Sequence, residues 1–213
     1  MLEWPAVKLC GLRRREDVDL ALDQGADALG FVHYERSPRH AGLAEIAELC
    51  QAVGPAAVCV LVVVDVEPAT LHGWAIDSGV GMVQLCGAED PQDFKDFPLP
   101  ILRRVGVDVD AEAELEAWRP VARGFVLDHP AAPGGTGLGV DLQRAADLAQ
   151  RAPCLLAGGI DGSNVAGRVA QVQPHGVDAS SRLEIRPGVK DPGAVRSYLV
   201  AAHRALASLG ERQ

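Results

Sequence analysis

Residues 57–64 read AVCVLVVV, a run of apolar side chains that no polar residue interrupts. Its β-branched valines favour an extended strand, and apolar side chains at every position indicate a strand that is covered on both faces. Strands of this kind are typical of parallel sheets, in which helices pack against the strands. The run therefore predicts a parallel sheet built from strand and helix units.

The same pattern recurs along the chain at fairly regular intervals. Seven further apolar runs are VKLC (7–10), ALGFV (28–32), MVQLC (82–86), ILRRV (101–105), GFVL (124–127), CLLA (154–157) and GVDA (176–179). Eight strands alternating with helices predict a compact (β/α)8 TIM barrel of the α/β class, as a single domain over residues 1–213. The alternative is an open, doubly wound sheet, which usually has fewer strands.

Segments between the runs carry the spacing of amphipathic helices. Examples are Val18, Ala21 and Leu22; Leu43, Ile46, Ala47 and Leu49; and Val195, Leu199, Ala202 and Leu206. Two Asp-Pro pairs, at 90–91 and 191–192, are helix start signals, because Asp caps a helix and Pro suits its first position. We therefore expect a helix to begin at each pair.

Composition limits the class of protein. The chain has 213 residues, 48% of them hydrophobic, enough for one substantial core. No run of 18 apolar residues is present, and the first residues, MLEWPAVK, carry an acid and a proline instead of a basic segment followed by an apolar one. We expect a cytoplasmic protein with no membrane partner.

Cysteine use and charge exclude other functions. The five cysteines, at 10, 50, 59, 86 and 154, form no CxxC pair, so we expect reduced thiols and no metal site. The formal net charge of -9 opposes nucleic-acid binding. A small anion can still bind where a few donors are fixed locally.

The first strand ends in a thiol. A parallel barrel places its active site at the carboxyl ends of its strands, where Cys10 lies. Strand alternation puts Lys8 on the same side as Cys10, and this cation is expected to lower the pKa of the thiol. The simpler alternative is a small core cysteine.

Two aspartates belong to later strands. Asp128 directly follows the sixth run, where it can exchange a proton at the barrel mouth or serve as a turn residue. Asp178 lies within the last run, either as a structural partner of Lys8 or as part of the site.

Small residues follow the last three strands. They are Gly134 to Gly137, Gly158-Gly159 and Ser180-Ser181. Loops after strands seven and eight are a recurrent phosphate site in barrels, since their backbone N–H groups can point at an anion. Arg36 and Arg39, in the loop YERSPRH, are candidates for a second anion, or are solvated loop cations.

The chain resembles the phosphoribosylanthranilate isomerase family of tryptophan biosynthesis over nearly its whole length. Eight fragments in register carry the resemblance: VKLCGL, GADALGFVHYERSPRH, VVVDVEP, MVQLCG, FVLDHPAAPGGTG, LLAGGI followed by Asn164-Val165, GVDASS and PGVKDP. The resemblance implies an Amadori rearrangement of N-(5-phosphoribosyl)anthranilate to the 1-deoxyribulose phosphate, without a metal or organic cofactor.

Residue roles are also implied by the resemblance. The family's general base on the sugar C2 proton falls on Cys10, and its general acid toward the ring oxygen falls on Asp128. Its carboxylate-binding arginine falls on Arg39, with Cys86 and Asp178 as further substrate-binding positions. The phosphate-binding positions are Gly135, Gly158, Gly159, Ser180, Ser181 and Arg182. A thiolate base and a neutral carboxylic acid would be in the opposite protonation states that the two proton transfers require.

The chain departs from the family pattern at several positions. Cys86 stands where histidine is usual, Arg182 where glycine is usual, and Val140 and Leu142 where an aromatic pair is common. We expect an isomerase that acts on a phosphosugar, as a monomer or a homodimer. The alternatives are a diverged paralogue that acts on another aminoaldose phosphate and a non-catalytic phosphosugar-binding protein, which would need neither Cys10 nor Asp128.

Overall fold

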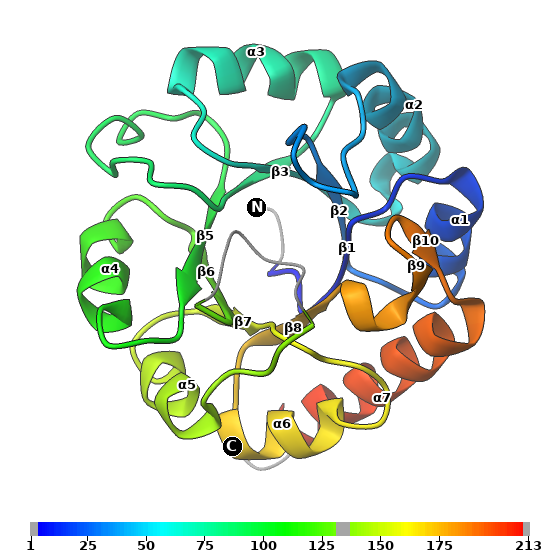
Figure 1. The fold of residues 1–213 in the computed structure, drawn as a ribbon, viewed down its shortest axis with the longest axis vertical. Helices are drawn as coiled ribbons and strands as arrows, with labels where there is room; N and C mark the ends of the chain where they lie inside the picture. Colours follow the sequence, from blue (N-terminus) through cyan, green and yellow to red (C-terminus); the bar gives the residue numbers. More distant parts are fainter. Residues whose placement is uncertain (1–3, 131–136, 211–213) are drawn as a thin grey trace.

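Eight parallel strands close into a barrel that an outer layer of helices surrounds (Figure 1). The computed structural model describes residues 4–130 and 137–210. The barrel strands are β1 (Val7–Cys10), β2 (Ala28–Val32), β3 (Val58–Val63), β4 (Met82–Leu85), β5 (Ile101–Gly106), β6 (Gly124–Asp128), β7 (Cys154–Leu156) and β8 (Gly176–Ala179). The helices are α1 (Arg15–Asp23), α2 (Leu43–Val53), α3 (Pro68–Ser78), α4 (Ala111–Trp118), α5 (Leu142–Ala149), α6 (Val165–Val172) and α7 (Pro192–Gly210).

Closure of the sheet decides between the two architectures that the sequence allows. Each strand pairs in parallel with the next, and β1 pairs with β8, with Lys8 opposite Asp178. The (β/α)8 barrel is confirmed, and the open sheet is wrong. The predicted strands agree with the observed ones to within one residue at either end.

One predicted helix is absent. The segment after Asp90-Pro91 forms consecutive turns, with Phe94 N–H donating to the Pro91 carbonyl and Phe97 N–H to the Phe94 carbonyl. Pro98 and Pro100 follow closely and cannot continue a helix, so the start signal opens only turns. Within the described residues, β4 and β5 are therefore the neighbouring strands with no α-helix between them. Asp191-Pro192 does begin a helix, α7.

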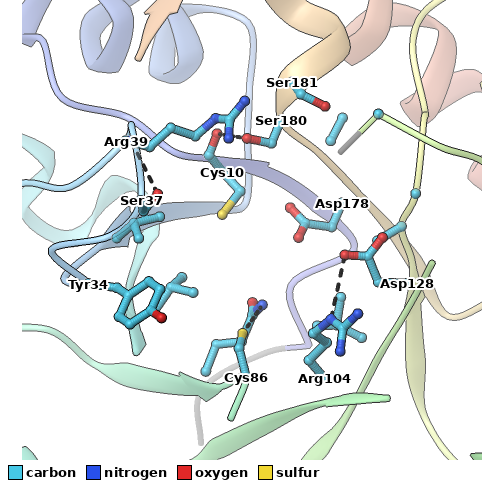
Figure 2. A pocket seen from close by; sticks show the side chains of 18 of the residues that line it. Cys10, Tyr34, Ser37, Arg39, Cys86, Arg104, Asp128, Asp178, Ser180 and Ser181 are labelled. Carbon is cyan, nitrogen blue, oxygen red and sulfur yellow. Dashed lines mark hydrogen bonds and ion pairs between the residues drawn. The ribbon is translucent and has the colours of Figure 1, made fainter. Parts of the chain in front are cut away.

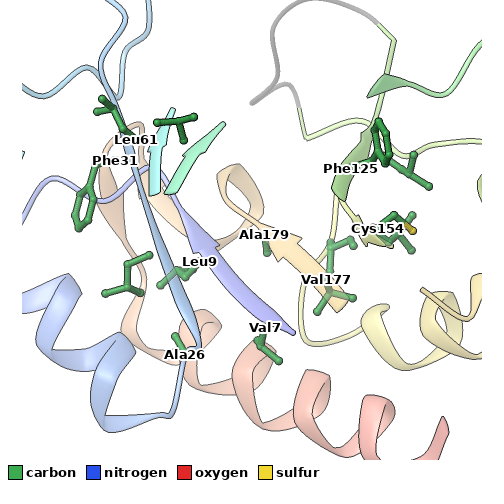
Figure 3. Close-up of a cluster of buried hydrophobic side chains, with 14 of the residues drawn as sticks. Val7, Leu9, Ala26, Phe31, Leu61, Phe125, Cys154, Val177 and Ala179 are labelled. Atoms are coloured by element: carbon green, nitrogen blue, oxygen red, sulfur yellow. The ribbon is translucent and has the colours of Figure 1, made fainter. Parts of the chain in front are cut away.

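Strand alternation separates two hydrophobic clusters. The larger one lies between the barrel and the helices and includes Val7, Leu9, Phe31, Leu61 and Phe125 (Figure 3). The smaller one fills the barrel and includes Cys10, Val60, Met82, Leu102, Val126 and Leu155. Each strand is thus buried on both faces, as the apolar run at 57–64 predicts.

Three further elements follow β8. They are a 3-10 turn, η2 (Ser181–Leu183), and two short strands, β9 (Glu184–Arg186) and β10 (Val189–Lys190), which pair antiparallel. A 3-10 turn, η1 (Gly54–Ala56), follows α2. The β9–β10 hairpin lies beside β1 (Figure 1), and Lys190 of β10 is close enough to Cys10 for its charge to act on the thiol.

Gly176 is required by packing at the start of β8. A Cβ atom there would lie 2.6 Å from Leu155 Cδ2 and closer still to the Ala6 carbonyl oxygen. We predict that Gly176→Ala lowers the free energy of unfolding by about 1–3 kcal/mol, the usual cost of overpacking a core. Urea denaturation followed by circular dichroism measures this change.

Gly167→Ala is the matched control for this substitution. Gly167 lies in α6, and nothing is within 4 Å of its Cβ position. Because alanine favours a helix over glycine, the control should gain about 0.5–1 kcal/mol. Equal effects of the two substitutions would contradict the packing argument.

Candidate active site

A pocket opens at the carboxyl ends of the barrel strands. Figure 2 shows side chains from opposite sides of the barrel facing it. The sequence-predicted residues among those described all line it: Cys10, Arg39, Cys86, Asp128, Gly158, Gly159, Asp178, Ser180, Ser181 and Arg182. Gly135, the remaining predicted residue, lies outside the described residues. The structure thus brings the residues that strand position and the family resemblance predict into one cavity.

Cys10 occupies the last position of β1 and faces the pocket (Figure 2). It is 8% exposed, and a Cβ atom on Gly30 of the neighbouring strand would lie 2.7 Å from its sulfur. Glycine at position 30 therefore leaves the space that the thiol fills. The Ser180 hydroxyl donates to the Cys10 carbonyl at 3.0 Å and ties this position to the end of β8.

The expected lowering of the Cys10 pKa is wrong. Burial raises the pKa of the thiol, and this outweighs the opposing effect of the Lys8 cation, while the Asp178 carboxylate raises the pKa further. Strand alternation correctly puts Lys8 beside Cys10, but it carries no information about desolvation. The thiol of the free protein is therefore neutral at pH 7.

Lys8 and Asp178 form a buried ion pair below Cys10. Their Nζ and Oδ2 atoms are 2.9 Å apart, and the two side chains are 0% and 8% exposed. Burial opposes the charge on Lys8, but the Asp178 carboxylate more than offsets this, so the pKa of Lys8 is raised and the ammonium persists. Asp178 Oδ1 has no hydrogen-bond partner within the described residues. Asp178 is thus both the structural partner of Lys8 and a pocket residue, the two roles that the sequence left open.

Asp128 ends β6 and faces the pocket from the side opposite β1 and β2 (Figure 2). Its Oδ1 accepts from the His129 backbone N–H at 2.8 Å, and its Oδ2 lies 3.8 Å from Arg104 Nε. The side chain is 16% exposed. A carboxyl group therefore stands where a bound molecule can reach it, with its orientation set by its own strand end.

The loop after β7 presents backbone N–H groups. Gly158 and Gly159 have φ values of +79° and +63°, a left-handed conformation that favours glycine. No group within the described residues accepts from either N–H. Ser181, at the start of η2, lines the same part of the pocket.

Two side chains fix the direction of these peptides. Arg168 Nη1 donates to the Gly158 carbonyl at 2.6 Å, and Asn164 Nδ2 donates to the Gly159 carbonyl at 2.9 Å. In a planar trans peptide the carbonyl and the following N–H point in opposite directions. Holding the Gly158 carbonyl therefore aims the Gly159 N–H away from Arg168.

The predicted anion-binding arginines already have acidic partners. Arg39 donates from Nε and Nη2 to the two carboxylate oxygens of Glu184, at 2.9 and 2.7 Å. Lys190 Nζ also binds Glu184, at 3.0 Å, which leaves the three-residue group with one net positive charge. Arg182 donates from Nε to Asp161 at 2.6 Å. Neither partner is apparent from the sequence.

Cys86 lies just beyond β4 and accepts a hydrogen bond from Gln84 Nε2 at 3.4 Å. Burial raises the pKa of its thiol to about 12, so Cys86 presents a neutral surface to the pocket. Among the described residues, no group of three or more His, Cys, Asp or Glu side chains could hold a metal ion. No helix in the described ranges is long and apolar enough to span a bilayer.

Comparison with known proteins assigns the chain to a family. Residues 7–201 match the family model of N-(5'-phosphoribosyl)anthranilate (PRA) isomerase. The chain belongs to this family.

Individual members agree with the assignment over almost the full length. The N-(5'-phosphoribosyl)anthranilate isomerase of Nitrobacter winogradskyi is 36% identical over 215 residues, which cover 96% of each chain. A phosphoribosylanthranilate isomerase crystallised with reduced 1-(o-carboxyphenylamino)-1-deoxyribulose 5-phosphate is 27% identical, with a TM-score of 0.84 over 94% of this chain and 100% of that one.

A third relative concerns assembly. The structure of monomers generated from the dimeric Thermotoga maritima isomerase is 26% identical, with a TM-score of 0.83 over 94% of this chain and 100% of that one. A monomer or a homodimer remains our prediction for the present family member.

Sequence reasoning missed one arginine that lines this isomerase pocket, Arg104, and one that supports it from behind, Arg168. Arg104 lies inside the run ILRRV and not after it, where the residues of a barrel site are expected. Alternation within the run puts one of its two arginines inside the barrel, so the sequence does carry a signal for this residue. Arg168 lies on α6 and acts only through the Gly158 carbonyl, so no local pattern marks it.

The raised Cys10 pKa predicts how the thiol of this isomerase reacts. Iodoacetamide attacks the thiolate, so the alkylation rate of Cys10 should rise about tenfold per pH unit from pH 7 to 9. Peptide mass spectrometry separates Cys10 from the other four cysteines. Free cysteine, with a pKa of about 8.5, is the reference and should level off first. A plateau for Cys10 below pH 8 would show that the Lys8 cation prevails over burial.

Proposed function

We propose that this pocket isomerises N-(5'-phosphoribosyl)anthranilate by acid–base catalysis, with Asp128 as the acid and Cys10 as the base. The observation that carries the proposal is the placement of one thiol and one carboxyl group on different sides of a single cavity, with the unpaired N–H groups of Gly158 and Gly159 also lining it. The family supplies the substrate. The reaction belongs to tryptophan biosynthesis.

Ring opening is the first step. Asp128 gives its proton to the furanose oxygen, the bond between that oxygen and C1 breaks, and the anthranilate nitrogen supplies the electron pair for an iminium group. Asp128 becomes a carboxylate. A positioned acid of this kind contributes about a hundredfold to ten-thousandfold to the rate.

Proton abstraction follows. Cys10 first gives its thiol proton to solvent and, as the thiolate, then removes the proton from C2. The electrons of that C–H bond neutralise the iminium and form an enolamine, and Asp128 regains its proton from solvent. Protonation of C1 and loss of the C2 hydroxyl proton then give the ketone, so atoms and charge balance without a cofactor. The adjacent iminium acidifies the C2 proton, and Lys8 lies on the same side of β1 as the thiolate.

The substrate's two anionic groups go to different places. The phosphate binds the N–H groups of Gly158, Gly159 and Ser181, where no protein acceptor competes within the described residues. Ser180 and Arg182 complete this end. The anthranilate carboxylate binds Arg39. Because Arg39 and Lys190 share the single carboxylate of Glu184, the three side chains together keep a net positive charge. Cys86 and Asp178 contact the substrate between these ends.

Two variants test the acid and base roles. Cys10→Ala and Asp128→Asn should each lower kcat/KM by about a hundredfold to ten-thousandfold, because each removes one proton transfer. The assay generates the substrate freshly and follows the loss of its fluorescence. The matched control is Cys59→Ala, since Cys59 packs against the helices outside the pocket and should retain activity. No turnover by the unmodified protein would reject the proposed function, and activity surviving in both variants would reject the mechanism.

A third variant tests the phosphate end. Arg182→Met should raise KM about threefold to tenfold with kcat within about twofold, because it removes a charge that meets bound phosphate before and during the reaction. Steady-state kinetics measures both constants. Arg186→Met, which removes an exposed arginine of β9, is the control and should leave KM unchanged. An unchanged KM in Arg182→Met would mean that its ion pair with Asp161 is structural only.

A further inference from the structure

Arg104 is a charged residue inside the barrel that the proposed chemistry does not yet use. Alternation along β5 turns Arg103 outward, where it binds Glu89 and Glu114, and turns Arg104 inward, opposite Val126 of β6. Its side chain is 12% exposed and lines the pocket (Figure 2). A cation held this deeply is costly unless its donors are used.

Two donors of Arg104 lie beside the end of β6. Nη2 donates to the His129 carbonyl at 2.6 Å. Nε is buried, has no hydrogen-bond partner within the described residues and lies 3.8 Å from Asp128 Oδ2. The other Asp128 oxygen accepts from the His129 N–H. The His129 peptide therefore holds Asp128 by a hydrogen bond, and the Arg104 charge lies beside the other carboxyl oxygen.

This arrangement differs from those of the other buried or anion-facing arginines. Arg39 and Arg182 each give their Nε to a carboxylate at 2.9 Å or less. The Nε of Arg104 is instead 3.8 Å from an oxygen of Asp128, which among the described residues is the carboxylate within 4 Å of Arg104. Because it is buried, a substrate atom cannot reach it without first displacing the wall of the pocket.

We propose that Arg104 is a positioning residue that stabilises Asp128 as its negative charge develops. The proposal rests on the proposed function, in which Asp128 loses its proton during ring opening. A shift of less than about 1 Å brings Nε into a charge-assisted hydrogen bond with the new carboxylate. Since this bond is made only as the proton leaves, it favours the transition state over the bound substrate and raises the rate of the chemical step.

The test is a double-mutant cycle read by single-turnover kinetics, with enzyme in excess over substrate. Arg104→Met should lower the single-turnover rate about tenfold to hundredfold, with KM within about threefold, and Arg104→Lys should recover part of the rate. In the Asp128→Asn background, Arg104→Met should change the rate by less than about twofold, since there is no charge left to stabilise. Arg36→Met is the control: this exposed arginine lines the same pocket, and its effect should be the same in both backgrounds.

Each outcome has one meaning. Equal losses from Arg104→Met with and without Asp128, or a raised KM at an unchanged rate, would overturn the positioning role. If Arg104→Met does not fold, Arg104→Lys completes the same cycle, because it keeps the charge and loses the Nε donor. Full activity of Asp128→Asn alone would reject the acid role, which is a failure of the proposed function and not of the coupling between the two residues.

Discussion

The ion pair between Lys8 and Asp178 is the interaction on which the closed barrel and its site both depend. These residues face each other directly across the seam between β1 and β8, where both side chains are buried. Either charge alone would be strongly destabilising there, so the pair enforces this register of the two strands. Cys10 is the next inward residue of β1 after Lys8, and its thiol therefore lies within reach of both charges. The seam is reinforced where α7 covers it, because the buried Tyr198 hydroxyl donates to the Lys8 carbonyl at 3.0 Å.

Anion binding in this acidic protein depends on how its cations are already paired. Glu184 is shared by Arg39 and Lys190, and Lys190 also donates to the Ser180 carbonyl, so the β9–β10 hairpin, the loop after β2 and the end of β8 are connected by one buried carboxylate. The Glu184 carboxylate fixes the Arg39 side chain in place and also lowers the net positive charge of the group around it. The phosphate end instead relies on peptide groups that Arg168 and Asn164 orient from behind. A phosphate that binds there meets N–H donors whose conformational entropy was already lost on folding. Such donors bind an anion without many free cations, as a protein of net charge -9 requires.

Much of this structure follows from the spacing of apolar residues in the sequence and from which residues lie at the ends of the apolar runs. Continuous apolar runs predict the eight strands, and the rule that barrel sites lie at strand ends brings Cys10, Asp128 and Gly158 together. The helix expected at Asp90 fails because two prolines downstream prevail over a local start signal. The partners of Arg39 and Arg182 were not predictable, since Arg39 and Glu184 are 145 residues apart and no local pattern relates them. Alternation gives the side on which a residue lies, but burial and partners come only from the assembled barrel.

The raised pKa of Cys10 is compatible with its work as a base. A thiol that ionises only at high pH is a stronger base once ionised, and the proton that it takes from C2 is acidified by the neighbouring iminium. The penalty for forming a thiolate in the barrel falls when a cation is nearby, and the pocket provides both the fixed Lys8 and the iminium that appears only after ring opening. Charge therefore builds in an order: the acid step at Asp128 creates the cation that makes the base step at Cys10 favourable. Burial holds the thiol neutral until then, and this protects it from reacting before substrate is bound.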